Sequence, residues 1–102
     1  MGIPKHAAKI DANQPDIVRA LGRVGAHVQI IKDPCDLLVG FRGGVHLVEV
    51  KASEAKAKSD AKGMSKTQRK QRALRENFGH VGVTVHVVWT EEMALKAIGA
   101  MA

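Results

Sequence analysis

The order of apolar and polar residues predicts a helix near the start of the chain. Over 13–24 the apolar positions recur every three or four residues, as on one face of a helix. These positions are Ile17, Val18, Leu21 and Val24. Asn13 has a side chain suited to cap this helix, Pro15 suits its first turn, and Gly25 suits its C-terminal end.

Four runs rich in β-branched and aliphatic residues predict strands. The runs are 26–32, 36–41, 44–51 and 82–89. Arg42, Gly43 and Gly44 lie around the junction of the second and third runs and suit the positive φ angles of a tight hairpin loop, so these two runs should form a hairpin. The apolar character of 83–88 indicates a sheet that is covered on both faces.

The segment between the hairpin and the last strand divides into a loop and a helix. Residues 52–63 are small, polar and rich in lysine, and they lack apolar anchors, so we predict a mobile basic loop. Ser65 and Gln68 have the spacing of a capping box, which predicts a helix from there to about Phe78, with Gly79 at its end.

A final helix is predicted after the last strand, with Thr90 as its cap and Gly99 at its end. The predicted order is therefore α-β-β-β-α-β-α, which places the chain in the α/β class, with a mixed central sheet flanked by helices. The 102 residues fit a flexible N-terminal arm at 1–12 and a single domain at 13–102.

Composition narrows the choice of partners. The chain carries a formal net charge of +6 at pH 7, which favours a polyanion, and nucleic acid before a membrane surface. Its single cysteine, Cys35, excludes an internal disulfide and fits a reducing compartment. We see no signal-peptide pattern and no membrane-spanning run, so we expect a cytoplasmic protein.

Three ionisable residues interrupt the otherwise apolar hairpin: Asp36, Glu49 and Lys51. Side chains alternate along a strand, so Glu49 and Lys51 share a face. A hairpin that pairs positions 39 and 46 would also bring Asp36 beside Glu49. Neighbouring carboxylates repel each other, and a hard divalent cation such as Mg²⁺ or Mn²⁺ would relieve that repulsion. Lys51 could then orient a water molecule or stabilise negative charge on a phosphate.

A structural interpretation stands beside this one. A Glu-x-Lys pair on a strand is commonly a solvated salt bridge, and Asp36 could belong to the same ion-pair cluster. A zinc site is not expected, because Cys35 and the histidines lack the spacing of zinc ligands.

The pattern Asp36…Glu49-x-Lys51 resembles the core of the PD-(D/E)XK nuclease superfamily. The chain looks most like the small VRR-NUC and Holliday-junction-resolvase-like branch with its stand-alone phage members, and the resemblance covers most of the chain. It implies a restriction-endonuclease-like α-β-β-β-α-β core. It also implies that Asp36, Glu49 and the carbonyl of Val50 bind the metal and that Lys51 is catalytic. Gln68 matches a glutamine that accompanies the site in this branch, although the capping box is an equal reading of the same residue.

The sequence departs from the family pattern at two positions. Cys35 stands where the family usually has a proline before the aspartate, and Pro34 lies one position earlier. Gln14 stands where the first helix of the family often supplies a glutamate to the metal, so its neutral amide would add less charge. Asp16 is close enough in sequence to substitute for it.

The resemblance implies a metal-dependent DNA endonuclease that hydrolyses phosphodiester bonds in branched, junction or flap DNA. A homodimer is expected, because symmetric cutting of a junction needs two active sites. The expected setting is a bacterial or phage-infected cell. The basic segment should contact DNA phosphates and make binding depend on salt. Its predicted DNA contacts are Lys56, Lys58, Lys62, Lys66, Arg69, Lys70, Arg72 and Arg75.

Two other functions remain open at this stage. The first is a non-catalytic DNA-binding module with a degenerate nuclease fold, which the neutral Gln14 favours. The second is a small subunit whose positive charge serves an acidic protein partner. A DNA assay distinguishes the three functions. Cleavage would support the nuclease, binding without cleavage the DNA-binding module, and no binding at low salt the small subunit.

Overall fold

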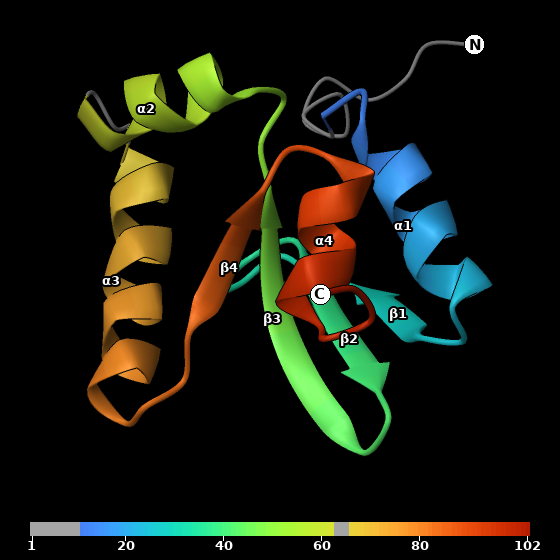
Figure 1. Cartoon of the computed structure of the whole chain (residues 1–102). Coiled ribbons are helices and arrows are strands. Elements are labelled where there is room, and N and C mark those ends of the chain that lie inside the picture. Colours follow the sequence, from blue (N-terminus) through green and yellow to red (C-terminus); the bar gives the residue numbers. More distant parts are fainter. Residues whose placement is uncertain (1–10, 63–65) are drawn as a thin grey trace, which may run out of the picture.

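The computed structural model describes residues 11–62 and 66–102, so most of the predicted arm, and Ser65 of the predicted capping box, lie outside the described residues. It shows an α/β fold with a four-stranded mixed sheet flanked by helices (Figure 1). The helices are α1 (Gln14–Arg23), α2 (Glu54–Lys62), α3 (Lys66–His80) and α4 (Glu91–Ala97). The strands are β1 (His27–Ile30), β2 (Leu37–Phe41), β3 (Gly44–Val50) and β4 (Val85–Val88).

The strands lie in the sheet in their sequence order, β1-β2-β3-β4. The first three form an antiparallel meander, whereas β4 runs parallel to β3. A parallel neighbour requires a crossover, and α2 and α3 form it (Figure 1). The two helices of the crossover are thus carried at the β4 end of the sheet.

The hairpin between β2 and β3 has the register that the sequence predicts. Val39 pairs with His46 and Phe41 with Gly44, which leaves a two-residue loop. Arg42 has φ 47° and Gly43 has φ 81°, so both loop residues lie in the left-handed region, as a type I′ turn requires. The Arg42 guanidinium also lies 4.7 Å from the centre of the Phe41 ring. This turn fixes which residues of the two strands face each other.

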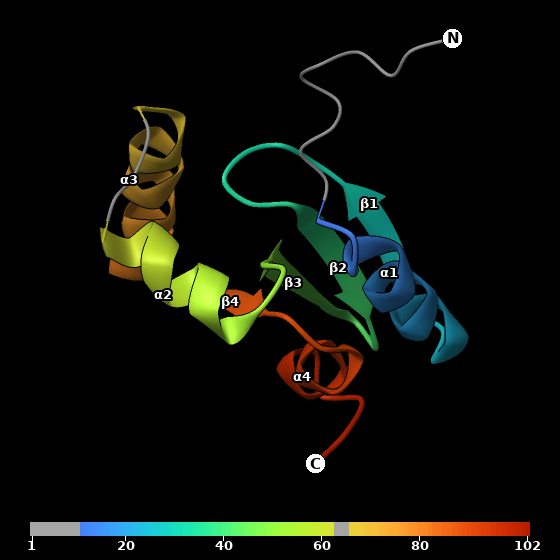
Figure 2. The same cartoon turned by 90° about the horizontal axis from the view of Figure 1, so that it is seen from above.

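One face of the sheet forms the hydrophobic core with α1 and α4, which Figure 2 shows on the same side of the strands. Leu37, Val39 and Val48 are completely buried on this face. Ile17 and Leu21 cover it from α1, Ala94 covers it from α4, and Ile98 covers it directly after α4; all four are buried too. This packing holds the ends of β3 and β4 in place.

The opposite face, which we call the site face, carries Glu49 on β3, Lys51 directly after β3, and Val85 and Val87 on β4. It is only partly covered, because Val87 remains 40% exposed. The prediction of a sheet covered on both faces was therefore wrong. The apolar run in β4 belongs to an edge strand that borders an open space beside α3.

Residues 54–62 form the helix α2, where we expected a loop. The segment has no apolar stripe, and for that reason the sequence pattern gave no sign of a helix. Alanine, lysine and glutamate nevertheless have high intrinsic helix propensity, and Glu54 pairs with Lys58 one turn later at 3.2 Å. The positive charges of this segment are thus held on a helix rather than on an irregular chain.

Asn13 does not cap α1, contrary to expectation, since its side chain makes no capping bond. Its amide Nδ2 instead donates to the carbonyls of Lys51 and Trp89, each at 2.9 Å. These carbonyls follow β3 and β4, so Asn13 links the start of α1 to the C-terminal ends of both parallel strands. The predicted cap of α4 is confirmed, because Thr90 Oγ1 accepts from the amide of Met93 at 3.1 Å.

Candidate functional site

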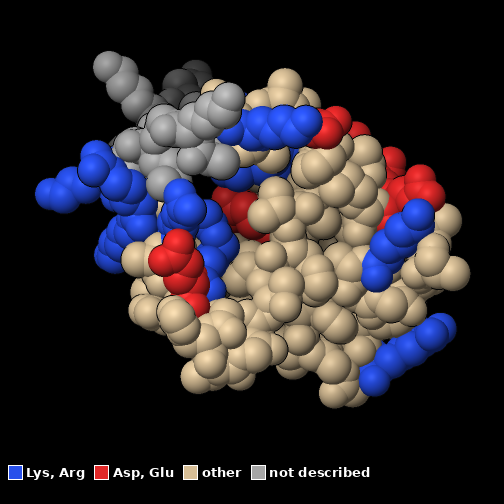
Figure 3. All heavy atoms as spheres, turned by 60° about the vertical axis from the view of Figure 1, so that its left-hand side comes forward, with Lys and Arg blue, Asp and Glu red and all other residues tan. Residues whose placement is uncertain are grey.

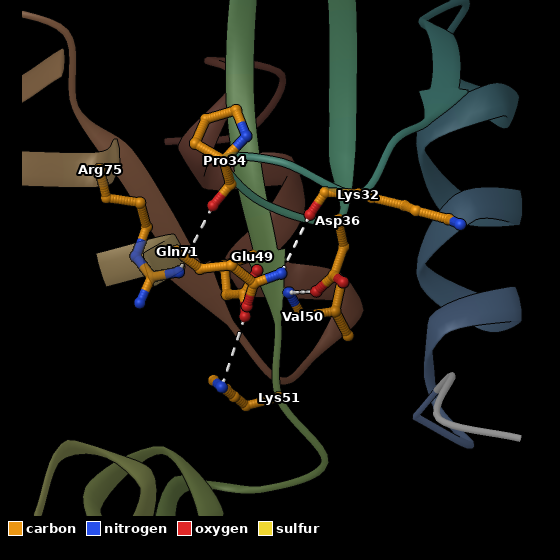
Figure 4. A network of polar contacts seen from close by, with 8 residues as sticks. All are labelled: Lys32, Pro34, Asp36, Glu49, Val50, Lys51, Gln71 and Arg75. Carbon is orange, nitrogen blue, oxygen red and sulfur yellow. Dashed lines mark hydrogen bonds and ion pairs between the residues drawn. The ribbon is translucent and has the colours of Figure 1, made fainter. Parts of the chain in front are cut away.

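Asp36 and Glu49 meet at the end of the β2–β3 hairpin, as the register predicts. Leu37 pairs with Val48, so the next pair outward is Asp36 with Glu49. Asp36 Oδ2 accepts a hydrogen bond from the backbone amide of Val50 at 2.8 Å, which continues the hydrogen bonding of the hairpin through a side chain (Figure 4). The amide fixes one oxygen of Asp36 next to the strand that carries Glu49.

Glu49 is a buried acid, with 5% of its surface exposed. Its Oε1 atom is buried and has no hydrogen-bond partner among the described residues. Burial, and then the negative charge of Asp36, raise the pKa of Glu49 to about 7. A buried carboxylate oxygen without a partner is unfavourable, so this arrangement favours the approach of a proton or a cation.

Lys51 supplies the nearest positive charge. Its Nζ lies 3.4 Å from Oε2 of Glu49, on the same face of β3 (Figure 4). The Lys51 ammonium opposes the rise in the pKa of Glu49. The Lys51 side chain is 15% exposed, so the pair lies at the edge of the solvent. The three residues singled out in the sequence therefore form one cluster.

The cluster fits a hard cation, although with few protein ligands. Asp36 and Glu49 offer oxygen atoms from adjacent strands, and Glu49 Oε1 lacks another partner. Among the described residues no group of three or more histidine, cysteine, aspartate or glutamate side chains can hold a metal ion. Mg²⁺ commonly binds through one or two carboxylates and keeps several water molecules, so two acids suffice for such a site. The carbonyl of Val50 stays a predicted ligand.

A cavity of about 490 Å³ opens beside the cluster, between α3 and the site face. Glu49 lines it from β3, Lys51 lines it directly after β3, and Gln68 lines it from α3. Gln68 therefore borders the same cavity as Glu49 and Lys51, and its role there stays a prediction. The capping role of Gln68 depends on Ser65 and cannot be compared, since Ser65 lies outside the described residues.

Two further residues hold α3 beside the site: Gln71, which the sequence analysis did not single out, and Arg75, which it named only as a DNA contact. Gln71 Nε2 donates to the carbonyl of Lys32 at 3.0 Å, and an Arg75 guanidinium nitrogen lies 3.5 Å from the carbonyl of Pro34 (Figure 4). Both carbonyls belong to the β1–β2 loop that leads into Asp36. The positive charge of Arg75 also acts to lower the pKa of Glu49. Their spacing of four residues was a signal for a shared helix face.

Gln14 is buried, with 4% of its surface exposed, at the first position of α1. The neighbouring Asn13 bonds to the carbonyl of Lys51, so the start of α1 lies at the C-terminal end of β3. The family resemblance places Gln14 in this region. Its contact with a metal stays a prediction. Asp16, the predicted substitute, is exposed and pairs with Arg19.

Most of the predicted DNA contacts are exposed on α2 and α3. Figure 3 shows Lys and Arg side chains gathered on this side of the molecule around a recessed acidic side chain. The exposed ones are Lys56, Lys58, Lys66, Arg69, Lys70 and Arg72. The side chain of Lys62 lies outside the described part, and Arg75 is half-buried against the β1–β2 loop.

Cys35, next to Asp36, is completely buried, and its thiol lies 3.6 Å from the carbonyl of Leu37. Burial raises the pKa of this thiol to about 11. A neutral, buried thiol is a poor nucleophile, so Cys35 acts as part of the core.

No family model, curated protein or solved structure matches this chain significantly. Within 11–62 and 66–102, no helix is long and apolar enough to cross a membrane.

Proposed function

We propose that this protein is a metal-dependent nuclease that hydrolyses phosphodiester bonds in DNA. The observation that supports it best is the meeting of Asp36, Glu49 and Lys51 at one end of a hairpin, beside a cavity lined by arginine and glutamine. In this proposal the sheet, with α1 and the crossover, is a small restriction-endonuclease-like core. The resemblance of the sequence to PD-(D/E)XK nucleases points to the same chemistry.

Asp36 and Glu49 would hold Mg²⁺ or Mn²⁺, with the carbonyl of Val50 and the amide of Gln14 as further predicted ligands. When bound, the cation would polarise the scissile phosphate and lower the pKa of a bound water molecule. Lys51 would keep the attacking water next to the phosphorus atom and neutralise charge that develops on the phosphate oxygens. Gln68 would donate its amide to a phosphate oxygen from the other side of the cavity.

The substrate would be bound through its backbone. The exposed cations of α2 and α3 are long, flexible side chains, and such side chains suit contacts to phosphates. Binding would therefore depend weakly on base sequence. We propose that the DNA structure, such as a branch, junction or flap, selects the substrate.

A cleavage assay tests the proposal. The protein is incubated with junction, flap, single-stranded and duplex DNA, with Mg²⁺, with Mn²⁺ and with a chelator. We expect nicking only with a divalent cation. Asp36→Asn and Lys51→Ala should each reduce the rate by at least about a hundredfold, the lower range measured for loss of a group that acts in the transition state, while DNA binding is retained.

Two exposed residues of α4 provide matched controls. Glu92→Gln removes an acid and Lys96→Ala removes a lysine, and both residues lie outside the cavity that Glu49 and Lys51 line. Both variants should cut DNA at the parent rate. Cutting that persists in a chelator, or in Asp36→Asn, would contradict the proposed site.

A second measurement examines the cation directly. Millimolar Mg²⁺ or Mn²⁺ should raise the melting temperature of the parent protein, because a ligand that binds only the folded state stabilises it. Glu49→Gln should abolish this increase, and Glu92→Gln should leave it unchanged. An equal increase in Glu49→Gln would show that the cation binds elsewhere.

A non-catalytic DNA-binding module is the second candidate. It is favoured by the neutral Gln14 and by the lack, among the described residues, of a group of three or more side chains that could hold a metal ion. In that case Asp36, Glu49 and Lys51 would form an ion-pair cluster that shapes the end of the hairpin. DNA binding without cutting under every cation would establish this function instead.

A further inference from the structure

The face of α3 that borders the cavity is polar, which is unusual for a helix beside a sheet. A helix normally turns an apolar stripe toward the sheet that it covers. Here the residues along the cavity recur every three or four positions and include one glycine. They are Gln68, Gln71, Arg72, Arg75, Glu76 and Gly79.

The part of the opposite wall beyond Glu49 and Lys51 is largely apolar. Val83, Val85 and Val87 line it from β4 and the residues before it. The large apolar residues of α3 do not fill the space, because neither Leu74 nor Phe78 lines it. The cavity therefore has one wall that suits a flat apolar group and another that suits an anion.

We propose that this cavity holds one unpaired nucleotide of the DNA strand to be cut. Its base would lie against the valines of β4, and its phosphate would lie toward Lys51, Arg72 and Arg75. The protein would accordingly act on single-stranded segments and leave intact duplex largely uncut. This inference rests on the proposed nuclease function and specifies its substrate.

Size and charge support this occupant. A volume of about 490 Å³ lies within the ~300–1,000 Å³ of sites for drug-sized ligands, which matches a single nucleotide. A base that is stacked and paired in a duplex must first leave the stack to enter such a space, which costs a few kcal/mol. An unpaired base enters without most of that cost. The cavity is lined by three cations, Lys51, Arg72 and Arg75, and by two acids, Glu49 and Glu76. Arg72 pairs with Glu76 at 3.2 Å, and the remaining excess of positive charge favours a phosphate over a neutral ligand.

Gly79 allows the cavity to be filled without removal of any charged group. A Cβ built at Gly79 meets no atom within 4 Å, and Gly79 has no positive φ, so Gly79→Ala can be accommodated and Gly79→Leu projects a larger group from the same open position. Gly22 on α1 is a matched control, because it is also an exposed helical glycine with open space around it. Gly22 lies outside the cavity.

The first test compares cleavage of single-stranded, flap and intact duplex DNA of one sequence. The parent should cut the unpaired substrates at least about tenfold faster than the duplex, the factor that corresponds to 1.4 kcal/mol. Gly79→Leu should lower the rate on unpaired DNA toward the duplex rate, with Gly79→Ala in between and Gly22→Leu unchanged. Equal rates on duplex and flap, or a parent-like Gly79→Leu, would overturn the inference and leave the nuclease function standing.

The second test uses binding alone, so that it stands if no DNA is cut. An oligonucleotide carries 2-aminopurine at one unpaired position, and its fluorescence rises when that base leaves its stacked neighbours. The full-length protein should produce a saturable rise that Gly79→Leu abolishes and Gly22→Leu retains. Absence of the rise in the parent would overturn the inference. Loss of cutting on every substrate, with this rise intact, would overturn the nuclease proposal instead.

Competition separates the base from the phosphate. Millimolar dAMP should displace the oligonucleotide from the parent at a concentration at least about tenfold below that of inorganic phosphate, since only dAMP can occupy the apolar wall. Equal displacement by phosphate would show that the cavity binds the anion alone, which would contradict the proposed place for the base.

Discussion

The acid at position 49 should make the folded protein less stable as the pH rises. Its pKa is about 7 in the folded protein and 4.5 as a reference, so the folded state binds the additional proton between these values. The contribution of Glu49 to stability is therefore complete below about pH 4.5 and is lost as the pH rises through 7.

Glu49→Gln should remove this loss. At pH 8 the variant should be about 1–3 kcal/mol more stable than the parent without a cation, because each pKa unit corresponds to about 1.4 kcal/mol and loss of the pair with Lys51 offsets part of the gain. At pH 4 the two proteins should differ little. Urea unfolding at both pH values, in a chelator, measures the difference. A variant that is less stable at pH 8 would show that the acid is not strained in the folded state.

Asn13 should be important for stability although it is a polar residue at the edge of a helix. Aspartate has the same size as asparagine and is also favoured at the start of a helix, but Asn13→Asp removes the Nδ2 donor. The carbonyls of Lys51 and Trp89 would each lose a bond, so we expect a loss of about 1–3 kcal/mol. Thermal or urea unfolding measures it, and Asn77→Asp, at an exposed position of α3, is the control. A loss equal to that of the control would contradict this role.

At the site, the sequence predicted the pairing of Asp36 with Glu49 but not the role of Asn13. The meeting of Asp36 with Glu49 followed from the tight hairpin predicted at Arg42 and Gly43, because pairing positions 39 and 46 also brings 36 beside 49. The role of Asn13 could not be predicted, since its partners lie 38 and 76 residues away in the chain. A capping residue and a long-range amide donor look the same in a sequence.

At the scale of secondary structure, α3 depends on polar contacts rather than on an apolar interface. Gln71→Ala should release the bond to the carbonyl of Lys32 and allow α3 to open more often. A hydrogen bond of this kind contributes about 0.5–1.5 kcal/mol, so the amides of α3 should exchange about two- to tenfold faster with little change in global stability. Hydrogen exchange measures this, with Asn77→Ala on the same helix as the control. Unchanged exchange in α3 would show that other contacts hold it.

Element prediction failed where packing and propensity point in different directions. The segment 54–62 has helix-forming residues and no apolar stripe, so its periodicity gave no signal even though its composition did. The helix α3 itself was predicted, but the sequence did not show which of its two faces lies toward the sheet. Leu74 and Phe78 form an apolar face, and Gln71 and Arg75 form a polar one; only the structure decides which of them borders the cavity.

At the scale of the whole molecule, the positive charge should control DNA binding. Each phosphate contact that is lost lowers the slope of log K against log salt by about 1. Arg69→Ala and Lys70→Ala should each show this decrease, because both residues are exposed on α3. Lys96→Ala on α4 should not. Binding of a fluorescent oligonucleotide at several salt concentrations gives the slopes, and equal slopes in all three variants would contradict a DNA surface on α3.

Symmetric cutting of a junction needs two active sites, so we expect a homodimer in solution. The chain has a mass of 11.0 kDa, and sedimentation equilibrium should therefore give about twice this value. A monomer at every concentration tested would contradict the dimer.

Fold class was the easiest property to predict at this scale, because it follows from the order of helices and strands along the sequence.

The crossover between β3 and β4 also bears on how the chain assembles. β1, β2 and β3 contact neighbours in sequence through short connections, whereas β4 reaches β3 only after α2 and α3 have been spanned. Contacts between distant parts of a chain form more slowly than local ones, because closing the intervening loop costs entropy. We therefore expect the hairpin with the acidic pair to form before the strand that carries the valine wall. A folding intermediate without β4 would thus carry the two carboxylates but lack the enclosure around them.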